Sequence, residues 1–281
     1  MDKQLFIIGN GFDLYHGLNT TYKNFYQYLK ARNKPTFTVT ASVCFDQYDE
    51  TDRLWSDFEN ELSNFDYNSI TIYLDEYNDE GKIVELTPIK SIDKIIDTWK
   101  SKIDKEFKSW ILTNERNLSP CGRHFNQNAI FLNFNYTFTL QKLYGVQDNQ
   151  ILYIHNNIND DNLIYGHGTK FELRNLLDAY GLLEDNDTVC ATEYQLRDIL
   201  TIQKIGSKFQ KNVSDIISAH SDFIKTLQDV QSIIVLGHSL NEIDMNYFKW
   251  IRQNTNNDIK WYFSYYSKQD CKRAEKACEQ L

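Results

Sequence analysis

The stretch LFIIGNGFD, residues 5–13, joins an apolar run to a turn that contains two glycines. The run over residues 4–8 has the length and composition of a buried parallel strand. Thr20 or Thr21 then offers an N-cap for a helix that begins at Tyr22. Strand, glycine turn and helix in this order are typical of the opening of a Rossmann-like unit.

The rest of the chain alternates strand and helix patterns. Strands are predicted at 129–134, 151–154, 162–165, 232–236 and 259–265, with helices at 138–143, 171–183, 193–203, 213–230, 242–253 and from Lys268. Two amphipathic helical patterns, 54–65 and 92–111, precede this alternation. We therefore predict one α/β domain over residues 1–281 with an open parallel sheet, and a large, mostly helical insertion or cap over residues 35–125.

Composition excludes several classes of protein. A net charge of −9 does not favour binding to nucleic acid. No apolar run is long enough to cross a bilayer, and the N-terminal run is too short for a signal peptide. The five cysteines are scattered and form no CxxC pair, as expected of reduced thiols. We expect a cytoplasmic protein that does not associate with membranes.

Polar residues follow each predicted strand before the last, 259–265. Since ligands bind beyond the carboxyl ends of parallel strands, we expect these residues to form a site. They are Gly9, Asn10, Gly11 and Asp13; Asn133, Asn135, Tyr136 and Thr137; His155, Asn156 and Asn157; Gly166, His167 and Gly168; and Gly237, His238, Ser239, Asn241 and Asp244.

The two glycine turns resemble known motifs only in part. Leu14 stands where a GxGxxG fingerprint has its third glycine, and no acidic residue follows at the ribose-binding distance, so a dehydrogenase is disfavoured. A tight turn capped by Asp13 is the alternative to an anion cradle. Asn241 stands where a nucleophile elbow has its second glycine, which disfavours a serine hydrolase. Glu59 on its helix and His16 beside the first turn stay open as ligand contacts.

Taken together, these motifs resemble the AbiH family of bacterial abortive infection proteins. The resemblance spans nearly the whole chain and is specific only as a set. It rests on Ile8 to Leu14 with Gly17, Thr20 and Tyr22; Trp55 to Glu59; Leu132 to Thr137; Tyr165 to Gly168; and Leu236 to Leu240 with Asp244.

A second resemblance is to the sirtuin-like and DHS-like NAD-binding folds, in which an Asn-Tyr-Asp element and a His-Gly follow successive strands. Asn135 and Tyr136 match the first element, but Thr137 replaces its aspartate. His155 is followed by asparagine instead of glycine, so the catalytic histidine is either His155 or His167.

These resemblances imply that the protein binds NAD or a related nucleotide and hydrolyses its N-glycosidic bond. Asn135 would orient the ribose or water, and a neutral His155 or His167 would accept a proton. The first glycine turn would hold the diphosphate, while Gly237, His238, Ser239 and Asp244 close the site. No metal is expected, a phage-derived trigger is implied, and oligomerisation stays open.

Two alternatives remain. The protein could sense a nucleotide without catalysis and signal through its helical insertion. It could instead be a metal-dependent nuclease or phosphodiesterase that uses Asp13, Glu59 and His167.

Overall fold

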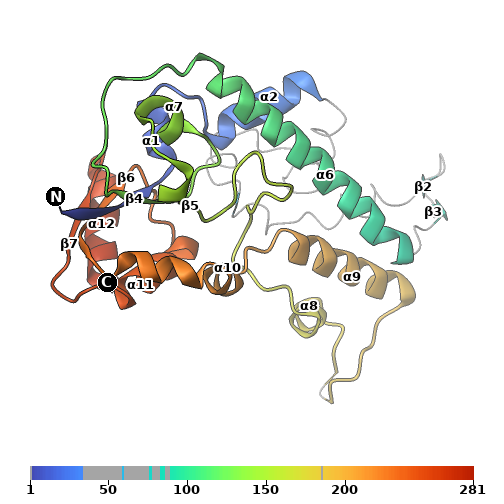
Figure 1. The fold of residues 1–281 in the computed structure, drawn as a ribbon. Helices are drawn as coiled ribbons and strands as arrows, with labels where there is room; N and C mark the ends of the chain where they lie inside the picture. The colour runs from blue at the N-terminus through green and yellow to red at the C-terminus, as the bar shows by residue number, and fades with distance from the viewer. Residues whose placement is uncertain (1, 34–58, 60–75, 78–82, 86–88, 185) are drawn as a thin grey trace. The chain divides into compact units, whose positions relative to one another are not determined.

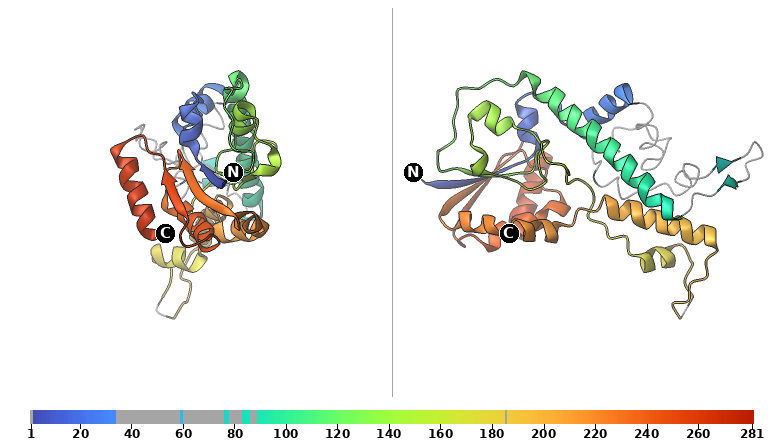
Figure 2. Two further views of the ribbon diagram at one scale, coloured as in Figure 1. Left: turned by 60° about the vertical axis from the view of Figure 1, so that its left-hand side comes forward. Right: turned by 45° about the vertical axis from the view of Figure 1, so that its right-hand side comes forward.

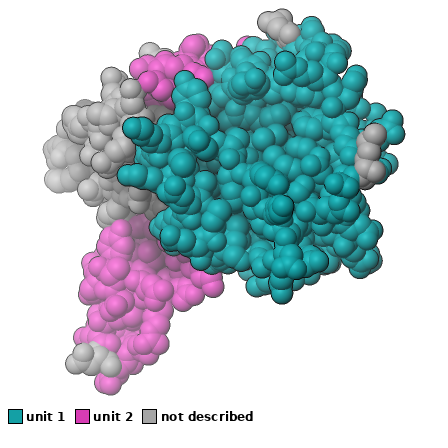
Figure 3. Space-filling model, turned by 90° about the vertical axis from the view of Figure 1, so that its left-hand side faces the viewer, with its two compact units in different colours: residues 1–21, 108–164, 212–281 teal, residues 22–107, 165–211 magenta. Residues whose placement is uncertain are grey.

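The structure is a computed structural model that describes residues 2–33, 59, 76–77, 83–85, 89–184 and 186–281. The predicted helix 54–65 and most of the predicted insertion over 35–125 lie outside the described residues. The chain divides into two compact units (Figure 3). Unit 1 comprises Met1–Thr21, Lys108–Ile164 and Asn212–Leu281, and unit 2 comprises Tyr22–Phe107 and Tyr165–Lys211.

Unit 1 is built on a five-stranded parallel sheet, which confirms the predicted α/β fold class. The sheet order is β5-β4-β1-β6-β7. Numbered along the chain within this sheet, the order is 3-2-1-4-5, the arrangement of Rossmann-like folds. The strands are β1 (Lys3–Ile8), β4 (Ile130–Asn133), β5 (Ile151–Tyr153), β6 (Val230–Leu236) and β7 (Lys260–Phe263).

Helices cover both faces of the sheet, because side chains alternate across the central strand β1. Leu5 and Ile7 join one buried cluster with residues of α10 (Val213–Ala219), α11 (Met245–Gln253) and α12 (Lys268–Gln280). Phe6 and Ile8 join another with residues of α1 (Asn10–Tyr15) and α7 (Thr139–Tyr144). These two layers lie on opposite sides of the strands (Figure 1, Figure 2). A sheet apolar on both faces explains why its strands have continuous apolar sequences.

Unit 2 contains α2 (Tyr22–Arg32), α8 (Leu173–Ala179), α9 (Glu193–Lys208) and the hairpin of β2 (Glu76–Tyr77) and β3 (Ile83–Glu85). The long helix α6 (Ile89–Asn114) begins in unit 2 and ends in unit 1. Its predicted apolar stripe is buried, as at Ile92, Ile96 and Ile103.

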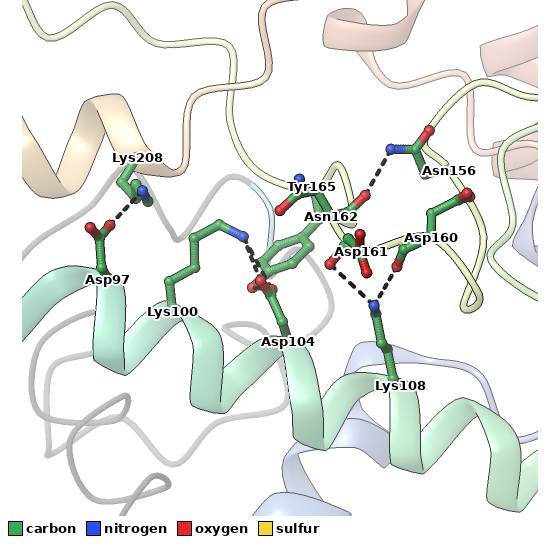
Figure 4. Close-up of polar contacts among 10 residues, drawn as sticks. All are labelled: Asp97, Lys100, Asp104, Lys108, Asn156, Asp160, Asp161, Asn162, Tyr165 and Lys208. Atoms are coloured by element: carbon green, nitrogen blue, oxygen red, sulfur yellow. Dashed lines mark hydrogen bonds and ion pairs between the residues drawn. The ribbon is translucent and has the colours of Figure 1, made fainter.

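The polar side of α6 makes ion pairs or hydrogen bonds within each unit (Figure 4). In unit 2, Asp97 pairs with Lys208 of α9, and Asp104 accepts hydrogen bonds from Lys100 and the Tyr165 hydroxyl. In unit 1, Lys108 donates to the backbone of residues 160 and 161. None of the described helices is long and apolar enough to cross a membrane.

Two predicted elements are wrong. Residues 162–165 form no strand, because Ile164 bonds through its amide to His155 O and through its carbonyl to the Tyr136 hydroxyl. The predicted helix 213–230 ends at Ala219, and a 3-10 segment follows over Ser221–Leu227. Val230 already pairs with β1, so the sheet takes residues that the helical spacing had assigned to a helix.

Candidate functional site

The two glycine turns of unit 1 pack directly against each other. Gly11 N donates to Gly237 O at 2.7 Å, and Gly9 N donates to Leu236 O at 2.9 Å. A Cβ on Gly9 would lie 2.5 Å from His238 Cα, and a Cβ on Gly237 would lie 2.2 Å from the amide nitrogen of residue 12. These glycines are therefore required for contact between the turns.

This contact lies at the switch point of the sheet. β4 and β6 flank β1 on its two sides, and ligands of such sheets bind beyond the carboxyl ends of the strands at this point. Gly237 has φ +64°, a left-handed conformation that favours glycine. The structure thus brings the predicted turns together, but Gly11 N is already used by Gly237 O.

Asn10 bonds to the chain itself. Its Nδ2 donates to Thr20 O at 2.9 Å, and its Oδ1 accepts from Thr20 Oγ1 at 2.6 Å. The pair closes the loop between α1 and α2, which accounts for both residues without a ligand. The role of Asn10 in nucleotide binding stays a prediction.

Asp13 is a buried carboxylate in α1, the helix that follows β1. Its side chain is 1% exposed, and Thr137 Oγ1 donates to its Oδ2 at 2.7 Å. Oδ1 has no hydrogen-bond partner among the described residues. Burial raises the pKa of Asp13 from 3.8 to about 6, and the nearby hydroxyls of Thr139 and Thr137 act in the opposite direction. A carboxyl with such a pKa exchanges its proton near neutral pH.

Asn135 lies beside this carboxyl and is held by backbone contacts. Its side-chain Nδ2 donates to Gly9 O at 3.1 Å, and its backbone N–H donates to Asn133 Oδ1 at 3.0 Å. Asn135 is 6% exposed. The segment after β4 therefore meets the first glycine turn through Asn135. Thr137, which replaces the expected aspartate, bonds to a carboxylate supplied by Asp13.

Glu115 and Thr139 extend this polar cluster and were not predicted from the sequence. Thr139 Oγ1 donates to Thr137 Oγ1 at 3.0 Å. Glu115, buried in the 3-10 turn Glu115–Asn117, accepts from the Phe138 amide and pairs with Lys142 at 2.6 Å. Its charge also raises the pKa of Asp13. Thr139 could have been found from its position two residues after Thr137, whereas Glu115 follows a long helix and carries no motif.

His155 follows β5 and lies among aromatic rings. Its ring packs edge-on against Phe134 at 5.3 Å between centroids and lies 5.8 Å from Tyr247. The residue is 4% exposed. It shares unit 1 with Asn135, and its catalytic role stays a prediction.

His238 and Asp244 face each other at the end of β6. Leu240 N donates to His238 Nδ1 at 2.9 Å, so this nitrogen carries no proton and the neutral ring is protonated on Nε2. Nε2 lies 3.7 Å from Asp244 Oδ2. Ser239 between them is exposed. Nucleotide binding by these residues stays a prediction.

His167 belongs to unit 2, as do Gly166 and Gly168. It is buried, and burial lowers its pKa. Its backbone bonds to Phe209 O and to Lys211 N. In the same unit the buried Lys211 pairs with Glu59 at 3.0 Å, and Glu59 accepts from the Tyr22 hydroxyl at 2.7 Å. Three segments of the AbiH resemblance therefore contribute to unit 2.

A metal-dependent reaction would need clustered ligands. The described residues contain no group of three or more His, Cys, Asp or Glu side chains placed to hold a metal ion. Of the residues named for that alternative, Asp13 belongs to unit 1, and Glu59 and His167 belong to unit 2. The alternative stays a prediction.

Comparison with known proteins identifies one family. The family model described as "Bacteriophage abortive infection AbiH" matches residues 5–265, nearly the whole chain. No match is found among curated proteins or among solved structures.

Proposed function

The chain belongs to the AbiH family of bacteriophage abortive infection proteins, which implies a role in bacterial anti-phage defence. We propose that it acts by hydrolysing the N-glycosidic bond of a nucleotide such as NAD. The nucleotide would bind at the carboxyl edge of the unit 1 sheet. A reaction that removes NAD would stop the metabolism of an infected cell.

The observation that carries this proposal is the position of Asn135. Its side chain reaches from the end of β4 to Gly9 O, at the end of the neighbouring strand β1. The strand order is that of Rossmann-like folds, in which nucleotides bind at this edge. A side-chain amide here can hold a ribose hydroxyl or an attacking water through its oxygen, while its nitrogen bonds to Gly9 O.

The chemistry suits the groups at this edge. Cleavage passes through an oxocarbenium-like transition state, and nicotinamide leaves as a neutral molecule. The protein therefore has to hold the ribose and take a proton from water, and it needs no strong acid for the leaving group. Asn135 serves the first task. For the second, the sequence predicts His155 or His167, and Asp13 is a further titratable side chain at the carboxyl ends of the strands.

The test is release of nicotinamide from NAD by the purified full-length chain, with and without phage components as activators. Asn135→Ala should reduce the rate by about 10²-fold or more, as expected for loss of a group that positions the reactants. Asn128→Ala is the matched control, because this asparagine is exposed in the same unit. Absence of nicotinamide release by the wild-type chain under every activating condition would refute the proposal.

Nucleotide sensing without hydrolysis is the second candidate. It is favoured by the extent to which polar groups of the edge bond to one another, as Asn10 does with Thr20 and Asp13 with Thr137. Such a network can rearrange around a ligand without a chemical step. Calorimetry that detects NAD binding, followed by recovery of unchanged NAD, would support sensing in place of hydrolysis.

A further inference from the structure

The proposed hydrolysis requires a group that accepts the proton of the attacking water, and Asp13 is a candidate for this role. Its carboxyl lies at the carboxyl end of β1, in the same buried cluster as Asn135 and Thr137. One hydrogen bond, from Thr137 Oγ1, holds Oδ2, and Oδ1 has no partner among the described residues.

The direction of the hydrogen bonds determines which oxygen can take a proton. Thr139 Oγ1 donates to Thr137 Oγ1, and Thr137 Oγ1 donates to Asp13 Oδ2. A proton on Oδ2 would reverse this chain of hydroxyls. A proton on Oδ1 leaves both hydrogen bonds in place, so Oδ1 is the basic oxygen.

The surroundings keep this oxygen reactive near neutral pH. An ionised carboxylate that is buried with one oxygen unpartnered is costly, which favours uptake of a proton. Glu115 is the charged group that faces Asp13 from the neighbouring turn, and Lys142 of α7 is paired with it. Burial and the Glu115 charge raise the pKa of Asp13 to about 6, so the carboxyl is mostly ionised at pH 7 and can still accept a proton.

The histidine of the β6 turn is less suited to this role. In His238, Nδ1 accepts the Leu240 amide and Nε2 faces Asp244. Its basic nitrogen is therefore already occupied by the backbone.

We propose that Asp13 is the proton acceptor of the site, with Oδ1 taking the proton of the water that attacks the ribose. This inference rests on the proposed hydrolysis. The bond between the ribose carbon and the nicotinamide nitrogen breaks, and its electron pair stays on nicotinamide. A bond forms between that carbon and the water oxygen, and the released proton moves to Oδ1 and then to solvent.

The experiment is the pH dependence of kcat/KM for nicotinamide release by the full-length chain. The wild type should lose activity in proportion to proton concentration below pH 6, since only ionised Asp13 accepts a proton. Asp13→Asn should reduce activity by about 10²–10⁴-fold and abolish this dependence. Asp222→Asn, which removes an exposed carboxylate of the same unit, should leave both unchanged.

Thr137→Val provides a second variant that keeps the carboxylate. It removes a hydrogen bond that stabilises the ionised form of Asp13, so the loss of kcat/KM on acidification should begin at a higher pH. Two results would overturn the role of Asp13: an Asp13→Asn variant that retains wild-type activity, or a Thr137→Val variant whose activity falls at the same acidic pH as that of the wild type. In either case, hydrolysis by the wild type would uphold the proposed function. A wild type without hydrolysis would overturn both.

Discussion

The contact between the two glycine turns should be among the least tolerant features of unit 1, and Gly237→Ala tests it. A Cβ at this position would lie 2.2 Å from the amide nitrogen of Phe12 and 2.5 Å from the carbonyl carbon of Gly11. Both neighbours are backbone atoms, so no side chain can rotate away. Relief requires the turns to separate, which breaks the 2.7 Å hydrogen bond from Gly11 N to Gly237 O.

The magnitude has two parts. The left-handed backbone at Gly237 costs alanine about 1–2 kcal/mol. Overpacking against backbone adds about 1–3 kcal/mol. The expected total is therefore about 2–5 kcal/mol of lost unfolding free energy.

Two matched variants separate these parts. Gly145 has φ +69°, and no atom lies within 4 Å of the position that an alanine Cβ would take, so Gly145→Ala reports the backbone cost alone. Gly9 has φ −117°, which alanine adopts freely, but its Cβ would lie 2.5 Å from His238 Cα. Gly9→Ala therefore reports the contact alone. The entropy that alanine removes from the unfolded chain is common to all three variants.

The assay is urea denaturation of the full-length chain, monitored by circular dichroism. We expect Gly237→Ala to be the most destabilised, Gly9→Ala to follow and Gly145→Ala to lose about 1–2 kcal/mol at most. If Gly9→Ala and Gly237→Ala are no less stable than Gly145→Ala, then the two turns do not pack against each other.

Further predictions concern the core, unit 2 and the titration of Asp13. Phe131 is fully buried between Phe6 and Phe125 rings, so Phe131→Ala should cost about 3–5 kcal/mol in the same denaturation assay, and a loss below about 1 kcal/mol would contradict its core position. Lys211→Met should lower the free energy of unfolding by about 3–5 kcal/mol, because it leaves the Glu59 carboxylate without this cation. Adding Glu59→Gln should recover part of the loss. If the losses of the two single variants simply add in the double variant, the ion pair does not contribute. The folded pKa of Asp13, about 6, exceeds its ordinary value of 3.8, so its contribution to stability is complete below about pH 4 and is lost as pH rises through 6. Thermal unfolding from about pH 4 to about pH 7.5 should therefore show a smaller decline for Asp13→Asn than for the wild type, and equal declines would refute the shift.

Local sequence patterns determine much of the fold because they report short-range preferences. The apolar run before Gly9 predicts β1, and the periodic stripe through Ile92 and Ile103 predicts α6. Sequence patterns fail where contacts with distant segments override local preferences. Residues 162–165 have a strand-like composition, yet Ile164 finds its hydrogen bonds at His155 and Tyr136.

Within the candidate site, the sequence indicates which residues follow the strands but not what they contact. Asn10 was predicted to face a nucleotide, and the structure shows both ends of its amide bonded to Thr20. Glu115 has no motif that would mark it, because its relation to Asp13 exists only in the folded chain. Side-chain partners far apart in sequence are set by packing, which local preferences do not encode.

The sequence by itself determined the parallel α/β class, the polar strand ends and the family, since these depend on periodicity and on residue identity. Tertiary structure decided which of these ends meet. Gly237 closes on Gly9 and Gly11 because β6 pairs with β1, and Thr137 reaches Asp13 across 124 residues because β4 pairs with β1 on its other side. Strand order depends on how the helices bury both faces of the sheet, a long-range balance of packing that no single stretch of sequence contains.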